Sequence, residues 1–232
     1  MAEPRPSIVD KRRSFRKMHA AGCFVIPNPW DVGSARFLQG LGFKALATTS
    51  SGFAWSRGCA DNTITRDMAL AHLHDIVAAT DIPGNADFES GFAVDATGVA
   101  QSVRLAVETG VAGLSIEDST GDVSKPLFDV GEAVIRIRAA RQAIDKCGGD
   151  TLLVGRAECF LVGRPDLAET IAALGVRRIS VGGALARSAW GGFMRAAKLL
   201  AEQGRFDGFA DAASGSELNS FFLRDAKERG LQ

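Results

Sequence analysis

Gly84-Asn85-Ala86-Asp87-Phe88-Glu89-Ser90-Gly91-Phe92 is the most informative segment of this chain for its fold. It closes a short strand predicted over residues 82–88, between two segments with helical patterns. Asp87 and Glu89 are two residues apart, so on an extended strand end their side chains point the same way. Two carboxylates beside glycine-rich backbone can hold a hard divalent cation.

A second acidic strand end follows in the stretch Gly113-Leu114-Ser115-Ile116-Glu117-Asp118-Ser119. Three or four carboxylates would then meet at one edge of a parallel sheet, where such folds place their sites. For each acid taken alone, the alternative is that it caps the helix that follows. Helix capping does not by itself call for acids at the ends of two neighbouring strands.

Composition indicates one globular domain. The 232 residues are 46% apolar and 23% charged, which suits an α/β domain with a sizeable core. We expect a single barrel-like domain over residues 1–232, with an N-terminal helix and a C-terminal helical extension. Basic and acidic residues balance at 27 each, which gives no electrostatic case for nucleic acid or an anionic membrane. No apolar run is long enough to span a bilayer, and residues 1–17 lack the apolar core of a signal peptide. We therefore expect a cytoplasmic protein.

Cysteine and histidine spacing does not indicate a metal site. The cysteines, expected to be reduced thiols, are Cys23, Cys59, Cys147 and Cys159. Cys159 follows a predicted strand and either borders a site or fills the core as a small buried residue. His72 and His74 are two apart on a predicted helix, so they do not share a face, and we expect both in solvent.

Strand and helix patterns alternate along the chain. Strands are predicted over 24–27, 45–49, 82–88, 113–116, 151–155 and 178–181, with Ser50-Ser51-Gly52 as a turn after the second. Helices are predicted over 8–21, 32–42, 66–80, 98–109, 130–146, 165–174, 185–202 and 216–227. This alternation predicts a parallel sheet covered by helices. No G-x-G-x-x-G or phosphate-loop motif follows a strand, so nothing argues for nucleotide binding.

Six pieces of this pattern resemble one family. They are Pro27-Asn28-Pro29-Trp30-Asp31-Val32-Gly33-Ser34-Ala35, Thr48-Thr49-Ser50-Ser51-Gly52, the acidic stretch 86–92, Ser115-Ile116-Glu117-Asp118, Arg156-Ala157-Glu158 and Arg178-Ile179-Ser180-Val181-Gly182. In this order they resemble the isocitrate lyase/phosphoenolpyruvate mutase superfamily, in its carboxyvinyl-carboxyphosphonate phosphorylmutase-like branch. Each piece alone is weak, but together they are specific.

The resemblance implies an α/β fold of the (β/α)8 TIM-barrel type with Mg²⁺ at its C-terminal mouth. It implies a lyase or phosphonomutase that breaks or moves a C–C or P–C bond in a small 2-oxo or 2-hydroxy carboxylic acid, through an enolate. It also implies a homo-oligomer, a dimer or tetramer, formed by exchange of a C-terminal helix. A helix packed on its own barrel is the simpler alternative.

The same resemblance assigns roles to individual residues. Asp87, Glu89 and Glu117 resemble the carboxylates on the Mg²⁺ side, and Asp61 a further acid of that group. Ser51, Gly52 and Phe53 resemble the turn whose backbone N–H groups hold the substrate, with Trp30 as another substrate-binding residue. Arg156 resembles the cation that faces the substrate oxyanions. Arg156, Glu117 and Asp61 are thus the catalytic candidates at the barrel mouth, since Mg²⁺ and a guanidinium can stabilise an enolate oxygen.

The loop after the second acidic strand departs from the lyases. Isocitrate and methylisocitrate lyases carry a Lys-Lys/Arg-Cys-Gly-His loop there, whereas residues 119–126 contain no cysteine or histidine. This argues against isocitrate lyase activity. Lys125 or Asp122 could act as acid or base on a closing lid, or could simply be a solvated loop residue.

The number of strand–helix units also departs from the family. Six are recognisable where the barrel needs eight. One hypothesis is an internal deletion of the sixth and seventh units, on the order of 55–60 residues, between residues 160–166 and 174–178. The sequence Leu-Val-Gly-Arg occurs at both 153–156 and 161–164. The alternative is a natural contraction to six units. The short barrel and the absent cysteine loop also leave open a second function, that of a catalytically impaired family member acting as an oligomeric or small-acid-binding protein.

Overall fold

Six parallel strands form the centre of the part of the chain that the structure describes. A computed structural model describes residues 5–158 and 178–230. The strands are β1 Phe24–Ile26, β2 Leu46–Ala47, β3 Gly84–Asp87, β4 Gly113–Glu117, β5 Leu152–Arg156 and β6 Arg178–Ser180. They pair in the orders β1-β6 and β2-β3-β4-β5. The N–H of Ala47 donates to the carbonyl of Pro27 over 3.0 Å, which links the two sheets.

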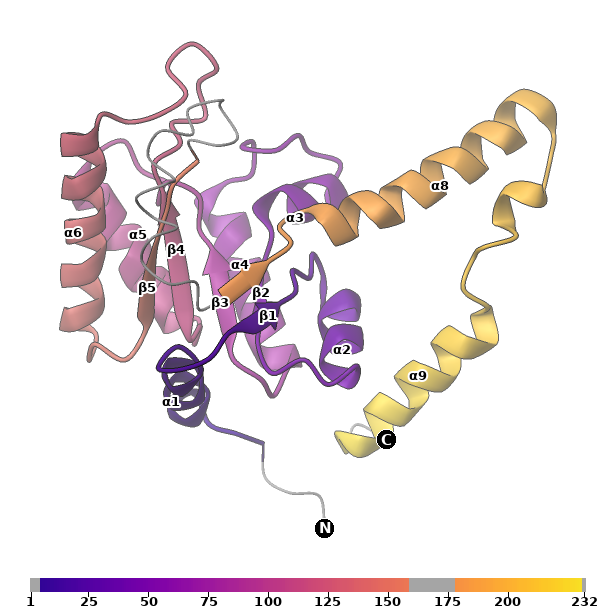
Figure 1. Cartoon of the computed structure of the whole chain (residues 1–232), viewed down its shortest axis with the longest axis horizontal. Coiled ribbons are helices and arrows are strands. Elements are labelled where there is room, and N and C mark those ends of the chain that lie inside the picture. The colour runs from indigo at the N-terminus through magenta and orange to yellow at the C-terminus, as the bar shows by residue number, and fades with distance from the viewer. Residues whose placement is uncertain (1–4, 159–177, 231–232) are drawn as a thin grey trace.

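Helices follow the strands in turn (Figure 1). They are α1 Ile8–Met18, α2 Val32–Gly40, α3 Ser50–Ser56, α4 Arg66–Ala79, α5 Ala96–Glu108, α6 Val130–Lys146, α8 Ala184–Gln203 and α9 Gly215–Glu228, with a short 3₁₀ turn at Asp207–Phe209. Parallel strands joined through helices confirm the predicted α/β class and agree with a contracted barrel. The predicted ranges match these elements to within a few residues, apart from α3 and the 3₁₀ turn.

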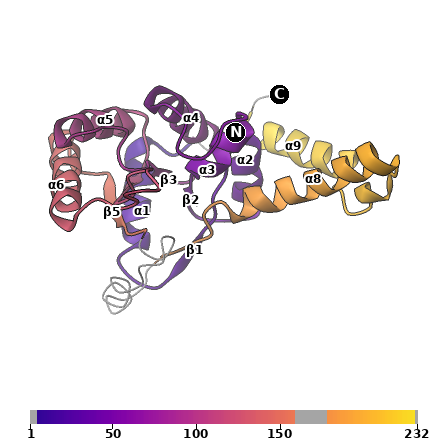
Figure 2. The same cartoon turned by 90° about the horizontal axis from the view of Figure 1, so that it is seen from above.

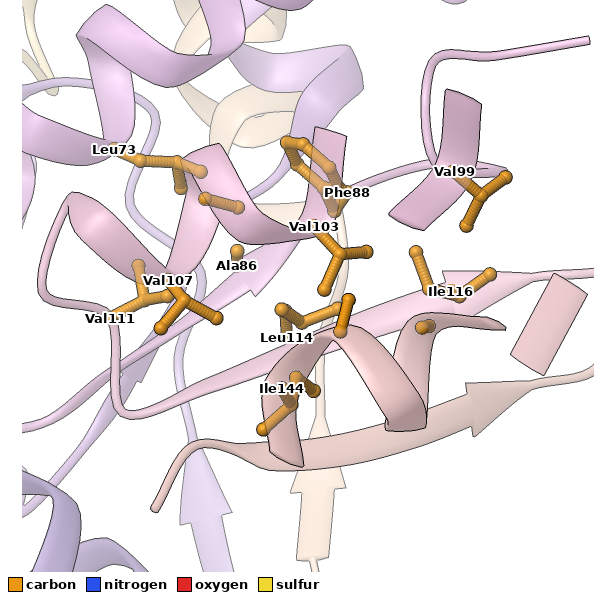
Figure 3. Packing of buried hydrophobic residues seen from close by; sticks show 13 residues of the cluster. Leu73, Ala86, Phe88, Val99, Val103, Val107, Val111, Leu114, Ile116 and Ile144 are labelled. Carbon is orange, nitrogen blue, oxygen red and sulfur yellow. The ribbon is translucent and has the colours of Figure 1, made fainter. Parts of the chain in front are cut away.

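The main core lies between β3, β4 and the helices α5 and α6 (Figure 3). Phe88, Leu114 and Ile116 from the strand side are at most 1% exposed. They pack against buried residues of the helices, among them Val99, Val103 and Ile144. Because apolar side chains on this face are removed from water, the two acidic strand ends are fixed side by side.

Side-chain caps set the helix starts. Asp31 accepts the N–H of Ser34 over 2.7 Å, and Thr65 accepts that of Met68 over 3.3 Å. The predicted turn at residues 50–52 is wrong, because these residues begin the helix α3. Thr49 caps this helix by accepting the N–H of Gly52. A seven-residue helix is too short for a periodic pattern to reveal it.

The C-terminal helices form an arm beside the strands. α8 runs away from the sheet and α9 returns toward α2 (Figures 1 and 2). Phe221 of α9 packs on Phe37 of α2 with ring centroids 4.8 Å apart, and Asp225 pairs with Arg36 over 3.2 Å. α9 therefore packs on its own chain, while α8 leaves large apolar side chains in solvent.

Some predictions fall on residues that the structure does not describe. The predicted helix at 165–174, Cys159 and the proposed deletion junction lie outside the described residues, and the deletion stays a prediction. No helix in the described ranges combines the length and apolar character needed to cross a membrane.

Candidate functional site

Asp87 is locked at the C-terminal end of β3. Its Oδ2 accepts the N–H of Ser50 over 2.9 Å and the hydroxyl of Ser50 over 3.0 Å. Its own N–H donates to the hydroxyl of Thr48 over 2.9 Å. The carboxylate therefore faces the start of α3 and keeps one oxygen for another partner.

Arg156 is that partner, and it joins three carboxylates. It ends β5, directly opposite Glu117 of β4 in the parallel register. Its Nη1 lies 3.1 Å from Asp87 Oδ1 and 3.3 Å from Glu117 Oε2. Its Nε pairs with Glu158, whose N–H donates to Asp118 Oδ1 over 2.8 Å. The guanidinium thus links the C-terminal ends of three neighbouring strands.

The acids at this edge outnumber the nearby cations. Burial, followed by repulsion from Asp87, raises the pKa of Glu117 to about 8, although Arg156 partly offsets this. Burial, then the charges of Asp87 and Asp61, raise the pKa of Glu89 to about 7. Burial alone would lower the pKa of Arg156, but the surrounding carboxylates more than offset it. An additional cation would therefore be stabilised here.

Glu89 is held in an unusual backbone conformation. Its φ is +45°, in the left-handed region that non-glycine residues rarely adopt. Its carbonyl accepts the N–H of Glu117 over 3.0 Å, which ties the two acidic segments together. Its Oε1 is buried and has no hydrogen-bond partner in the described part of the chain. A buried carboxylate oxygen of this kind calls for a donor or a cation.

Asp61, Trp30 and Lys125 lie at different distances from this cluster. Asp61 is close enough for its charge to act on Glu89, and burial raises the pKa of Asp61 itself. Trp30 packs against Gly52, where an added Cβ would approach the Trp30 Cβ to 3.0 Å. Lys125 lies on the exposed loop and pairs with Asp129 over 3.4 Å. The structure therefore brings Asp61 and Trp30 near the strand ends, while Lys125 faces its own loop.

The turn predicted to bind substrate lies in the first turn of α3. The N–H groups of Gly52 and Phe53 already bond to Thr49, through its hydroxyl over 3.3 Å and its carbonyl over 3.0 Å. The hydroxyl of Ser51 lies 3.1 Å from that of Thr49. A substrate could use the N–H groups of residues 52 and 53 only by displacing these bonds, so their binding role stays a prediction.

The donor types at this edge fit a hard divalent cation such as Mg²⁺. All the candidate ligands are carboxylate oxygens, and Glu89 has an unpartnered one. As the side chains stand, no three acidic, histidine or cysteine groups among residues 5–158 and 178–230 converge as metal ligands. Arg156 lies between Asp87 and Glu117, so direct coordination by both would require its guanidinium to move.

Sequence reasoning missed several residues around this site. Glu158 follows Arg156 by two positions, the same spacing that singled out Asp87 and Glu89. His72 was expected in solvent but is 8% exposed, with its ring stacked on Phe53 at 4.0 Å. That prediction is wrong because α3, which was not foreseen, covers this side of α4. Burial lowers the pKa of His72 to about 4.

A known family matches most of the chain. The model of the phosphoenolpyruvate phosphomutase family matches residues 15–172. The chain belongs to this family. The superfamily predicted from the motifs is thereby confirmed.

Individual relatives refine the comparison. The chain is 38% identical to a candidate lyase/mutase from Burkholderia cenocepacia J2315, whose crystal structure matches with a TM-score of 0.86 over 93% of this chain and 97% of that one. It is 32% identical to 2-methylisocitrate lyase of Escherichia coli K12 over 146 residues, 60% of this chain and 49% of the lyase. The chain spans about half the length of the curated relatives it matches. Phosphonopyruvate hydrolase, solved with oxalate and Mg²⁺, shares the fold at 18% identity, with a TM-score of 0.76 over 96% of this chain and 99% of that one.

Proposed function

We propose that this chain is a Mg²⁺-dependent lyase or phosphonomutase that acts on a small 2-oxo or 2-hydroxy carboxylic acid through an enolate. The observation that carries the proposal is the meeting of Asp87, Glu117 and Arg156 at the ends of three adjacent strands. An acid-rich edge with a single guanidinium suits a divalent cation on one side and an anionic substrate on the other. Membership of a family of lyases and mutases supports the same conclusion.

The acidic residues and the arginine at this edge would have different roles in the proposed reaction. Mg²⁺, when bound, would act as a Lewis acid on the oxo group. Asp87 and Glu89 would supply oxygen ligands to the cation, and Arg156 would supply positive charge for the oxygen that becomes negative as the bond breaks. Glu117, whose pKa is raised to about 8 by burial and by Asp87, would be the group placed to exchange a proton with bound substrate.

Cleavage of a C–C bond and transfer across a P–C bond both leave the same pyruvate-like enolate. The group that leaves must contact residues beyond Asp87 and Arg156, and we expect the loop 119–127, which follows β4, to cover it. This loop is closed by a bridge between Ser119 and Leu127. It has no cysteine to act as the general acid of the isocitrate lyases, so a lyase reaction here would use another proton source.

Binding without turnover is the second candidate. Arg156 already pairs with three carboxylates, and a small carboxylic acid would compete with Asp87 and Glu117 for its guanidinium. A catalytically impaired protein of this kind would bind oxalate or pyruvate but would cleave neither C–C nor P–C bonds. Turnover of 2-oxo acids, malate-type acids and phosphonopyruvate separates the two candidates.

The first experiment is a titration of the protein with Mg²⁺ and oxalate, which mimics the enolate of pyruvate. Calorimetry or the shift in melting temperature reports binding. We expect oxalate to bind only with Mg²⁺ present and the binding to vanish in Asp87→Ala. Asp145→Ala, which removes an exposed carboxylate on α6, is the matched control and keeps binding. Failure of the folded wild-type protein to bind would overturn the proposed site.

We also propose that the chain forms a homo-oligomer through α8. Trp190, Phe193 and Met194 on this helix are 38%, 63% and 48% exposed. Exposed apolar residues grouped on one helix are typical of a protein–protein interface. Light scattering tests the proposal: a single species of monomer mass would contradict it, and Phe193→Asp should dissociate the oligomer.

A further inference from the structure

Arg136 is a buried cation that the proposed chemistry does not use. It lies in the middle of α6 and is 2% exposed, the largest of the fully buried side chains. No carboxylate among the described residues forms an ion pair with it. Burying a charge without an ionic partner is expensive, so an apolar residue would fill this space more cheaply unless the guanidinium has specific partners.

Its partners are three backbone carbonyls of one loop. Nη2 donates to Ser90 O over 2.8 Å and to Ala93 O over 2.7 Å, and Nη1 donates to Val94 O over 2.9 Å. These carbonyls belong to the segment that follows Glu89. Charge-assisted hydrogen bonds from one rigid fork fix both the position and the orientation of such a segment.

This loop needs an external restraint. Glu89 has φ of +45° and Phe92 has φ of +51°, a left-handed conformation that is unfavourable for non-glycine residues. Gly91 between them has φ of +94° and packs against Val99, so the segment has little room to shift. Without the Arg136 hydrogen bonds, the loop would relax toward ordinary backbone angles and turn the Glu89 side chain.

The same guanidinium also contacts Phe128, the residue at the base of the 119–127 loop, which we call the lid. Its Cζ lies 4.2 Å from the centre of the Phe128 ring, a cation–π contact. The N–H of Phe128 donates to the carbonyl of Asp118 over 2.8 Å. Phe128 thus directly follows the loop 119–127 and ties the end of this loop to Asp118. Arg136 therefore touches both segments that flank the acidic edge.

We propose that Arg136 is a positioning residue that couples the base of the lid, through Phe128, to the Glu89 loop. A displacement of Phe128 moves the face on which the guanidinium rests, and the guanidinium carries the three loop carbonyls with it. The position of the Glu89 side chain therefore changes whenever the 119–127 loop closes over a ligand. The effect on ligand binding rests on the proposed function, whereas the mechanical coupling does not.

Hydrogen–deuterium exchange of the whole chain tests the coupling without any ligand. In Arg136→Met we expect exchange to accelerate about tenfold in both segments, 89–95 and 118–129. Arg141→Met, on the same helix but in an exposed pair with Asp145, should change neither. Arg136→Lys keeps the charge without the fork and should fall between them. Unchanged exchange in either segment of Arg136→Met would overturn the proposal.

Phe128→Leu provides the decisive variant, and it also serves if Arg136→Met does not fold. It removes only the ring on which the guanidinium rests and leaves the three carbonyl hydrogen bonds intact. Faster exchange in 89–95, the segment that Phe128 does not bond, is the expected result. Faster exchange confined to 118–129 would show that Arg136 merely fills space.

A parallel titration separates this inference from the proposed function. With Mg²⁺ present, oxalate affinity should fall about tenfold in Arg136→Met and in Phe128→Leu, and stay within twofold in Arg141→Met. If wild-type protein binds no oxalate, the proposed function fails while the exchange result still decides the coupling. If wild type binds and both variants bind equally well, coupling to the ligand is refuted.

Discussion

Carboxylates and arginines cluster both before β3 and at its C-terminal end. Donors outnumber the carboxylate in the first cluster, whereas carboxylates outnumber the arginine in the second. Asp81 precedes the strand and is shared by several donors: Arg5 Nε at 2.5 Å, Arg229 Nη1 at 2.8 Å and Gln39 Nε2 at 3.1 Å. Burial raises its pKa, but these donors more than offset that and lower it. At the other end, Asp87 shares one arginine with Glu117 and Glu158, and burial raises the pKa of both glutamates.

We interpret the Asp81 cluster as stabilising the fold and the Asp87 cluster as the candidate functional site. The Asp81 cluster joins the N-terminal segment, α2 and α9, so its charges are satisfied by parts of the chain that must stay together. The Asp87 edge carries three acids against one arginine, which agrees with the proposed role in binding a cation. In α/β barrels the N-terminal face commonly supports stability and the C-terminal face the reaction.

The largest expected effect is at the acid-rich end. Asp87→Asn removes the charge but can still accept the bonds from Ser50, so the fold should remain. We expect Mg²⁺-dependent oxalate affinity to fall by at least about 100-fold, which is about 2.7 kcal/mol. Calorimetry measures it, with Asp145→Asn as the control. Binding within fivefold of wild type would show that the acid surplus does not serve a cation.

The second effect is at the satisfied end. Asp81→Ala leaves Arg229, which is 7% exposed, without its carboxylate, and loosens the attachment of α9. We expect the free energy of unfolding to fall by about 1–3 kcal/mol, since the partners are partly buried. Urea denaturation measures this. Oxalate affinity should stay within twofold of wild type. A larger loss of affinity would show that the Asp81 cluster also contributes to ligand binding.

A smaller effect, of opposite sign, is predicted for Glu117→Gln. The folded pKa near 8 lies above the ordinary 4.5, so the native state binds the extra proton between these values. Stability from this group is present below pH 4.5 and is lost as the pH rises through 8. The variant should therefore be more stable than wild type at pH 8.5, by about 1–2 kcal/mol, and equal to it near pH 4.5. Melting curves at both pH values check this. A stability difference between variant and wild type that does not change with pH would show that Glu117 is not destabilised by the neighbouring negative charges.

The smallest effect is expected on the lid. Lys125 and Asp129 form an exposed pair, so Lys125→Ala should change the free energy of unfolding by less than about 0.5 kcal/mol. Oxalate affinity should also stay within twofold. If turnover is found and falls in this variant while oxalate binding does not, Lys125 is the acid or base of the lid. Loss of oxalate binding would instead make the lid part of the anion site.

Periodic and capped segments were predictable because their signals are local. The helix over 130–146 and the strands ending in Asp87, Glu117 and Arg156 lie where the apolar runs and breakers put them. α3 was missed because a seven-residue helix with Ser, Ser and Gly at its start looks like a turn. His72 was misplaced for the same reason, since its burial depends on Phe53 in that helix.

The candidate site was predictable only as a set of strand ends. Parallel pairing brings the carboxyl ends of neighbouring strands together, so the order of the strands was enough to predict that Asp87, Glu117 and Arg156 lie at one edge. The sequence also determined the family, because the motifs are specific in their order. These are properties of local sequence and of its order along the chain.

How the charges are shared depends on the folded arrangement of the chain. The pairing of Arg156 with three acids, the burial that raises the pKa of Glu117, and the joining of both chain ends at Asp81 depend on distances between segments far apart in sequence. So does Arg136, whose carbonyl partners lie more than 40 residues away. Burial and electrostatic pairing act through space, whereas propensity acts along the chain, and for that reason the sequence could name these residues but not their partners.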